Sequence, residues 1–193
     1  MPKDWIGNAQ AVHSVNLRGV NAEQNDYYAT EPKAVELLLE QETFHPYIWE
    51  CACGEGHMSK VLEAHGYKVH STDLIDRGYG EGGIDFLKES KPTMPMDIIT
   101  NPPYKYAKEF IEHALDISMD GTKIAMFLKL TFLEGQGRRE LFRNNPPQTV
   151  YVSSARLQCG KNGVFDEKNS AVAYAWFVWK KGHYGPTNIK WFN

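Results

Sequence analysis

The sequence predicts a doubly wound α/β fold around a mostly parallel sheet, with one antiparallel strand at a sheet edge. Apolar runs of strand length alternate with amphipathic stretches of helix length, which is the pattern of successive β–α units. A glycine turn and a polar, proline-containing turn directly follow two of these apolar runs. In a parallel sheet such turns meet at one edge, where ligands of this fold class bind.

The first part of the expected core contains two helices and two strands. Residues 32–41 carry apolar side chains at helical spacing and begin with a proline, so they predict an amphipathic helix. The apolar run 47–51 is followed by glycines and predicts a buried strand. Residues 57–66 predict a second helix that its final glycine closes, and residues 68–74 predict the next strand.

The second part of the chain continues the alternation. Residues 96–100 predict a third strand, which must end where an asparagine and two prolines follow it. A helix over 105–117, a central strand over 123–129 and a short helix over 137–144 come next. Residues 148–153 predict a further strand.

The last expected strand, residues 171–179, is rich in β-branched and aromatic side chains. The connection before it, residues 154–170, shows no helical pattern, so we expect this strand to run antiparallel at one sheet edge. The connection is polar, contains glycine and is too long for a tight hairpin. Loops of this length are often functional, and we expect it to contact the substrate.

Length and composition predict one domain over residues 1–193, with residues 1–25 as an N-terminal extension. Hydrophobic residues make up 42% and charged residues 23%, as in an ordinary soluble domain. No apolar run reaches the roughly 18 residues of a membrane span, and the N-terminus lacks a signal-peptide pattern. We therefore expect a cytoplasmic protein with no membrane contact.

The three cysteines, Cys51, Cys53 and Cys159, are compatible with a reducing compartment. The C-x-C pair is too close for ordinary disulfide or zinc spacing, and no second ligand pair follows it. We expect these side chains to pack in the fold and expect no metal.

Charge is distributed unevenly along the chain. Residues 1–122 hold 10 Lys/Arg and 20 Asp/Glu, a balance of −10, whereas residues 123–193 hold 11 and 4, a balance of +7. Such asymmetry is typical of proteins with a polyanionic partner. A solvated basic surface explains the same pattern equally well when the charge is taken alone.

The first motif is W-E-C-A-C-G-E-G-H-M, residues 49–58, in which an acidic residue ends a strand and two glycines bracket a tight turn. Gly54 and Gly56 allow the backbone to approach a ligand closely. The third glycine of the dinucleotide fingerprint is missing, and no Lys-Ser/Thr of a phosphate loop follows. Taken alone, the motif fits an ordinary strand-to-helix turn equally well.

The second motif ends the next strand. Asp73 lies 23 residues after Glu50, about where nucleotide sites of α/β folds place the carboxylate that binds ribose hydroxyls. An isolated aspartate could equally cap a helix. Together with the glycine turn, it favours a nucleoside site.

The third motif, Asn101-Pro102-Pro103-Tyr104, directly follows the strand 96–100. An aromatic amine is a poor nucleophile because its lone pair is delocalised into the ring. Two acceptors that bind its two N–H groups favour a tetrahedral nitrogen, and here the Asn101 side chain and the Pro102 main chain each offer a carbonyl. The prolines fix φ, so both acceptors are held before the substrate arrives.

The surroundings of this tetrapeptide decide its interpretation. As an isolated sequence it could be a proline-rich turn, but here it follows an apolar strand and two nucleoside-site motifs. The Tyr104 ring can stack against a base. A base inside a duplex cannot reach such a pocket, so it must flip out or be single-stranded.

With these motifs, residues 25–180 resemble the amino-methyltransferases that depend on S-adenosylmethionine. The likeness is to the adenine-specific DNA methyltransferases, in the short forms carried by phages and prophages. The resemblance implies a seven-stranded Rossmann-like class I methyltransferase sheet, S-adenosylmethionine as cofactor and methylation of the exocyclic amine of adenine. In that family N-P-P-Y is catalytic, and the acidic-G-x-G turn binds the methionine part of the cofactor.

The resemblance also assigns cofactor-binding positions in this sequence. The cofactor turn comprises Glu50, Cys51, Ala52, Gly54 and Gly56. Asp73 is expected to bind the ribose and Leu74 to lie against the adenine, while Asn101 serves both the catalytic and the cofactor site.

Two further segments match the family. Asp85 and Phe86, in G-I-D-F-L, match the D-F element that contacts the adenine of the cofactor. The segment 26–32, D-Y-Y-A-T-E-P, resembles the motif upstream of the glycine turn and places Tyr28 and Thr30 near the cofactor.

Nucleic acid, with DNA as the expected substrate, implies phosphate contacts in the basic half of the chain. We select Arg138, Arg156 and Lys161 from a larger basic set that also includes Lys129, Arg139 and Arg143. Many relatives carry a separate target-recognition domain. Here any sequence preference is expected to come from residues 154–170, from residues 131–145, or from a partner.

Other functions share parts of this pattern. RNA adenine methylation needs the same pocket and differs only in recognition of the 2′-hydroxyl. A protein glutamine presents similar N–H groups, although enzymes of that type usually carry an extra substrate-binding domain. A non-catalytic nucleotide-binding module is the fourth reading, but a site without activity need not keep Asn101 and Tyr104.

Overall fold

The fold is seen in a computed structural model that describes residues 27–161, 165 and 172–192. The expected N-terminal extension, residues 1–25, lies outside the described residues, as does most of the segment 162–171.

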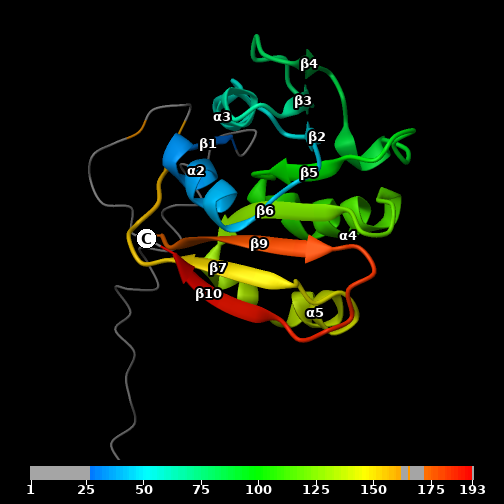
Figure 1. The fold of residues 1–193 in the computed structure, drawn as a ribbon, viewed down its shortest axis with the longest axis vertical. Helices are drawn as coiled ribbons and strands as arrows, with labels where there is room; N and C mark the ends of the chain where they lie inside the picture. The colour runs from blue at the N-terminus through cyan, green and yellow to red at the C-terminus, as the bar shows by residue number, and fades with distance from the viewer. Residues whose placement is uncertain (1–26, 162–164, 166–171, 193) are drawn as a thin grey trace, which may run out of the picture.

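The centre of the fold is an eight-stranded sheet with the order β10-β7-β9-β6-β5-β2-β3-β4 (Figure 1). In chain order its strands are β2 (Tyr47–Glu50), β3 (Lys68–Asp73), β4 (Glu81–Gly82), β5 (Asp97–Thr100), β6 (Lys123–Lys129), β7 (Thr149–Ser153), β9 (Tyr174–Lys180) and β10 (Asn188–Phe192). All neighbouring strands are parallel except that β9 is antiparallel to both β6 and β7. The predicted doubly wound, mostly parallel α/β class is thereby confirmed.

Two details of the sheet differ from the prediction. It has eight strands rather than seven, and the antiparallel strand lies inside the sheet, between β6 and β7, rather than at its edge. The strand β9 is interior because it pairs with β6 on one side and with β7 on the other. The outer side of β7 then pairs in parallel with the additional strand β10. Its sequence, NIKWF, is exposed except at its last residue, so it lacks the apolar pattern of a buried strand.

Among the described residues, four α-helices cover the two faces of the sheet, and all four were expected from the sequence. They are α2 (Pro32–Gln41), α3 (His57–Ala64), α4 (Ala107–Ile117) and α5 (Arg139–Asn144). Apolar side chains of α2 and α3 form one buried cluster with the sheet, and those of α4 and α5 form another on the opposite face. Successive strand residues alternate between them: Ile98 belongs to the α4 side and Ile99 to the α2 side.

A separate two-stranded ribbon was not expected. It consists of β1 (Tyr28–Thr30) and β8 (Cys159–Lys161), which pair antiparallel with Thr30 opposite Cys159. Strands of three residues give too short a pattern to detect in sequence. The ribbon places part of the long 154–170 connection against the segment before α2. It also brings β1 to the end of β5, where the Asn101 side chain donates to the Tyr28 carbonyl at 2.8 Å.

The described residues contain no helix that is both long and apolar enough to pass through a lipid bilayer.

A substitution of Trp176, in the middle of β9, tests whether that strand lies inside the sheet. Its side chain is fully buried, and its indole N–H donates to the Ala34 carbonyl of α2 at 2.7 Å. Trp176→Phe removes this hydrogen bond and leaves a cavity, so we expect the free energy of unfolding in urea to fall by about 2–3 kcal/mol.

The matched control is Trp191→Phe in β10, where the tryptophan is 69% exposed. This change should alter the free energy of unfolding by no more than about 0.5 kcal/mol. Equal effects of the two substitutions would show that β9 is not the buried strand described above.

Candidate functional site

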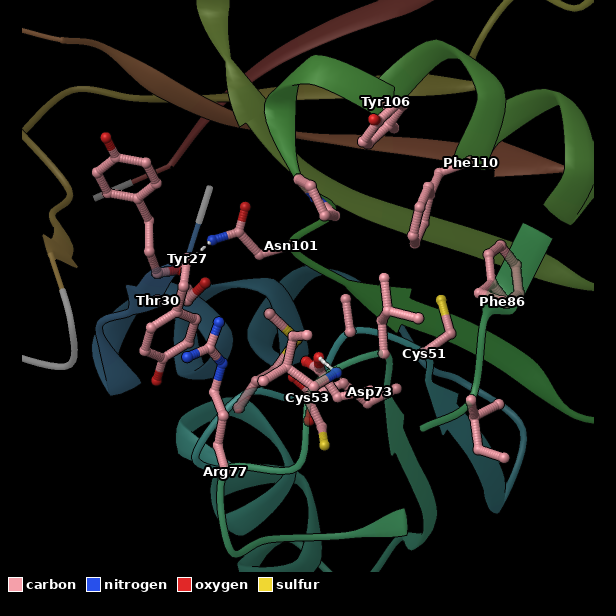
Figure 2. Close-up of a pocket in the computed structure, with 18 of the residues that line it drawn as sticks. Tyr27, Thr30, Cys51, Cys53, Asp73, Arg77, Phe86, Asn101, Tyr106 and Phe110 are labelled. Atoms are coloured by element: carbon pink, nitrogen blue, oxygen red, sulfur yellow. Dashed lines mark hydrogen bonds between the residues drawn. The ribbon is translucent and has the colours of Figure 1, made fainter. Parts of the chain in front are cut away.

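A cavity of about 500 Å³ lies at the carboxyl ends of β2, β3 and β5. Eleven of the residues that the sequence assigned to the site line it (Figure 2): Tyr28, Thr30, Glu50, Cys51, Ala52, Asp73, Leu74, Asp85, Phe86, Asn101 and Pro103. The parallel strands bring these residues together because their carboxyl ends share one edge of the sheet. Four assigned residues do not line it, namely Gly54, Gly56, Pro102 and Tyr104.

The carboxylate of Asp73 ties the glycine turn to the neighbouring strand. One oxygen accepts the Gly54 amide N–H at 2.8 Å and the other accepts the Ile75 amide N–H at 2.9 Å. A carboxylate has about four acceptor positions, so each oxygen can accept one further hydrogen bond. Asp73 is therefore fixed in place and can still bind a ligand hydroxyl.

Gly54 and Gly56 are required by the packing of the turn itself, and their contact with a ligand stays a prediction. Both have positive φ, 54° and 77°, which favours glycine. A Cβ on Gly54 would overlap the ring of Tyr27, and one on Gly56 would overlap the ring of Tyr79. The two glycines thus make room for aromatic side chains that pack on the turn, and they do not themselves face the cavity.

Glu50 ends β2 beneath this turn and is only 2% exposed. The Ser59 hydroxyl donates to its carboxylate, and the Ser59 and Ser71 hydroxyls lie 2.7 Å apart. Burial raises the pKa of Glu50 from 4.5 to about 8, although the hydrogen bond from Ser59 opposes the shift. A cationic ligand group beside Glu50 would favour its ionised form.

Phe86 and Phe110 line the end of the cavity that lies away from Tyr27 and Thr30 (Figure 2). The buried Phe86 ring packs edge-on against Trp49, with ring centroids 5.1 Å apart, and lies 5.0 Å from Phe110. Asp85 is the N-cap of the 3-10 helix Phe86–Lys88 and accepts the Leu87 amide N–H at 3.2 Å. The hydrogen bond and charge of Lys88 lower the pKa of the Asp85 carboxyl.

Asn101 presents its side-chain oxygen rather than its nitrogen as the open group. The amide nitrogen donates to the Tyr28 carbonyl at 2.8 Å. The amide oxygen is buried and has no hydrogen-bond partner among the described residues. A buried acceptor without a hydrogen bond destabilises the folded protein, and a ligand that donates a hydrogen bond to it would remove this cost.

The structure separates Tyr104 from the main cavity. Its ring stacks on Tyr28 with centroids 5.6 Å apart and planes 28° apart, and its hydroxyl lies 3.1 Å from Cys159 Sγ. Tyr104 instead borders a second cavity of about 200 Å³, where Lys129 Nζ lies 4.2 Å from the ring centroid. Asn101 and Tyr104 therefore border two different cavities, with the N-P-P-Y turn between them.

Buried polar atoms without partners concentrate at the main cavity. Five such side-chain atoms occur in the described part of the chain, and three belong to residues that line this cavity: Thr30 Oγ1, Arg77 Nε and Asn101 Oδ1. Native proteins pair nearly all buried polar groups. These atoms therefore indicate a polar ligand that offers both acceptors and donors.

The three basic residues assigned to nucleic acid lie in different settings. The guanidinium of Arg138 closes a turn by donating to three main-chain carbonyls, those of Thr131, Phe132 and Glu134. Arg156 is exposed between β7 and β8, and Lys161 ends β8. Contact with nucleic acid stays a prediction for all three.

Several aromatic and basic residues, and one cysteine, line the cavity without having been predicted from the sequence: Tyr27, Cys53, His57, Arg77, Lys105, Tyr106 and Phe110. Phe110 could have been found from the apolar face of the helix over 105–117. Arg77 lies in a loop with no sequence pattern. The described residues contain no group of three or more His, Cys, Asp and Glu side chains arranged to hold a metal ion.

No protein-family model matches the chain, and no curated protein matches its sequence. Solved structures do resemble it. A candidate class I S-adenosylmethionine-dependent methyltransferase from Listeria monocytogenes superposes with a TM-score of 0.59 at 13% identity, over 99% of this chain and 74% of that one.

Two further similar structures are named as a restriction-enzyme subunit and an rRNA methyltransferase. A modification subunit of a candidate type I restriction enzyme from Vibrio vulnificus gives a TM-score of 0.59 at 15% identity, over 94% of this chain and 51% of that one. The 23S rRNA methyltransferase ErmE gives 0.56 at 15% identity, over 80% and 70%. The chain thus shares the Rossmann-like fold of these methyltransferases.

The raised pKa of Glu50 makes stability depend on pH. Because the folded protein holds this proton up to about pH 8 and the unfolded chain releases it near pH 4.5, the folded state is favoured below pH 4.5 and loses this advantage as pH rises to 8. Relative to Glu50→Gln, the wild-type free energy of unfolding should fall by up to about 1.4 kcal/mol per pH unit in that window.

Urea unfolding at pH 5, 6, 7 and 8 measures this difference, with exposed Glu36→Gln in α2 as the control that should follow the wild type. Parallel pH curves for wild type and Glu50→Gln would show that Glu50 ionises in the folded protein as it does in water.

Proposed function

We propose that this protein transfers a methyl group from S-adenosylmethionine to the exocyclic amine of an adenine in DNA. The observation that carries the proposal is the buried, unpaired Asn101 side-chain oxygen at a cavity with the polar and aromatic groups of a nucleoside site. The fold shared with methyltransferases supports it.

The lining of the main cavity fits S-adenosylmethionine. Its volume lies within the range of small-molecule sites. Phe86 and Phe110 would hold the adenine ring, the fixed carboxylate of Asp73 would accept the ribose hydroxyls, and Glu50 would face the ammonium group. When bound, the cofactor supplies a methyl group on a positively charged sulfur, which is already activated for transfer.

The residues of the tetrapeptide would prepare the target amine. Because the Asn101 nitrogen is held by the Tyr28 carbonyl, the Asn101 oxygen is oriented to accept one N–H of the amine. The Pro102 carbonyl would accept the other, and the two proline rings keep the turn rigid. With both N–H groups bound, the nitrogen becomes more tetrahedral and its lone pair leaves conjugation with the ring. The methylated nitrogen would be cationic and acidic enough to release one proton to water, so no strong base or metal is needed in this mechanism.

The second cavity would admit the base. It borders Tyr104 and carries Lys129, Thr131 and Phe132, so it offers a ring for stacking and a cation near a phosphate. In this arrangement the cofactor and the base approach the N-P-P-Y turn from opposite sides. Since the pocket lies within the protein, the target base must be flipped out of a duplex or be single-stranded.

The nucleic-acid class of the substrate rests on two observations. The segment after residue 122 carries a surplus of seven positive charges (11 − 4), and structural neighbours include a restriction-modification subunit and an rRNA methyltransferase. RNA adenine methylation is the second candidate, because it uses the same pocket.

Asn101→Ala tests the amine-binding role. We expect methyl transfer to fall at least about a hundredfold, since the acceptor is lost, while affinity for S-adenosylhomocysteine changes no more than a few-fold. Radiolabelled methyl transfer and calorimetry measure the two quantities. Asn144→Ala, an exposed change at the end of α5, is the control. A transfer rate near that of the wild type in Asn101→Ala would refute the mechanism.

The identity of the substrate is tested by labelled methyl transfer to DNA, RNA and total protein in parallel, with digestion to nucleosides. We expect N6-methyladenine from DNA. The logarithm of DNA affinity should fall linearly with the logarithm of salt concentration, by about 0.9 per phosphate contact. Methyl label found only in RNA or protein would exclude DNA as the substrate. A DNA affinity that does not change with salt concentration would also exclude it.

A further inference from the structure

Arg77 lies in the loop after β3 and lines the main cavity at the end that also contains Thr30 and Tyr27 (Figure 2). Its guanidinium carbon is 4.2 Å from the centroid of the Tyr27 ring. The aromatic residues Phe86 and Phe110 lie at the other end of the cavity (Figure 2). Asp73 lies between the two ends, so Arg77 is on the side of Asp73 away from the proposed adenine position.

The Arg77 side chain is held in position before any ligand binds. Tyr27 packs on the glycine turn at Gly54, and its hydroxyl accepts the Glu55 amide N–H at 3.3 Å. The guanidinium lies over this fixed ring, in a cation–π contact. Arg77 is therefore oriented by the same turn that shapes the cavity.

Within the part of the chain that the structure describes, no carboxylate pairs with the charge of Arg77. Arg77 Nε is buried without a hydrogen-bond acceptor among the same residues. Two acidic groups close to Arg77 in the chain are engaged elsewhere: Asp73 accepts two main-chain N–H groups, and Asp76 accepts the Gly78 amide N–H at 2.9 Å.

A second donor lies at the same end of the cavity. The Thr30 side chain is 3% exposed, and its hydroxyl has no partner among the described residues. A buried N–H and a buried O–H, together with an arginine charge, suit a carboxylate, which is planar, anionic and accepts several hydrogen bonds. The unpaired Asn101 oxygen at this end is an acceptor and therefore serves a different group.

We propose that Arg77 and Thr30 form a subsite for the α-carboxylate of the amino-acid part of the cofactor. The inference rests on the proposed function, because it takes S-adenosylmethionine as the ligand of the main cavity. It assigns the adenine to the Phe86 end, the ribose to Asp73 and the carboxylate to Arg77. A structural role for Arg77, limited to holding Tyr27, and a role in binding a nucleic-acid phosphate are the alternatives.

Calorimetry with two ligands tests the subsite. S-adenosylmethionine carries the carboxylate, and decarboxylated S-adenosylmethionine lacks only that group. We expect Arg77→Met to weaken binding of S-adenosylmethionine by about 10- to 100-fold and to change binding of the decarboxylated ligand less than about threefold. Arg77→Lys should recover part of the loss, and Thr30→Val should show a smaller loss of the same selectivity.

Lys68→Met is the matched control, since it removes an exposed positive charge from the opposite end of β3. It should leave binding of both ligands unchanged. Wild-type protein should itself prefer S-adenosylmethionine to the decarboxylated ligand by a similar factor. That comparison requires no substitution and remains decisive if Arg77→Met does not fold.

The outcomes separate this subsite from the proposed function. Equal losses for both ligands in Arg77→Met, or no preference of the wild type between them, would overturn the subsite and leave the methyltransferase proposal standing. Unchanged cofactor binding with weaker DNA binding would assign Arg77 to a phosphate and also overturn it. Failure of the wild type to bind either ligand would overturn both proposals.

Discussion

The hydrogen bond from the Asn101 side-chain nitrogen to the Tyr28 carbonyl orients the centre of the site. An amide has one acceptor and one donor end, so fixing the nitrogen on β1 fixes the oxygen toward a ligand. This bond joins the end of β5 to the short ribbon of β1 and β8. The position of a single acceptor therefore depends on three segments that are far apart in the sequence.

The same ribbon organises the surroundings of the tetrapeptide. Tyr28 stacks on Tyr104, and Cys159 lies beside the Tyr104 hydroxyl. On the other side, Asp73 holds the glycine turn, and that turn supports Tyr27 and through it Arg77. Each group proposed to face the cofactor is thus positioned by another part of the fold, as a preorganised site requires.

Much of this arrangement could be predicted from the sequence, because periodic apolar runs and the turns that follow them are local signals. Such local signals predicted the four helices and the six longer strands. They also predicted that Glu50, Asp73 and Asn101 lie at one edge of the sheet. The ribbon and β10 could not be predicted, because their strands are too short or too exposed. Arg77 could not be identified either, since its place depends on the three-dimensional packing of Tyr27 on a glycine.

The central claim is that the Asn101 oxygen and the Pro102 carbonyl grip the amine of an adenine. A crystal structure of the protein with an adenine-containing oligonucleotide and a non-reactive cofactor analogue tests it most directly. We expect the adenine amine nitrogen to lie about 2.7–3.2 Å from both oxygens, between the two cavities. An amine bound elsewhere, with the Asn101 oxygen still unpaired, would contradict it.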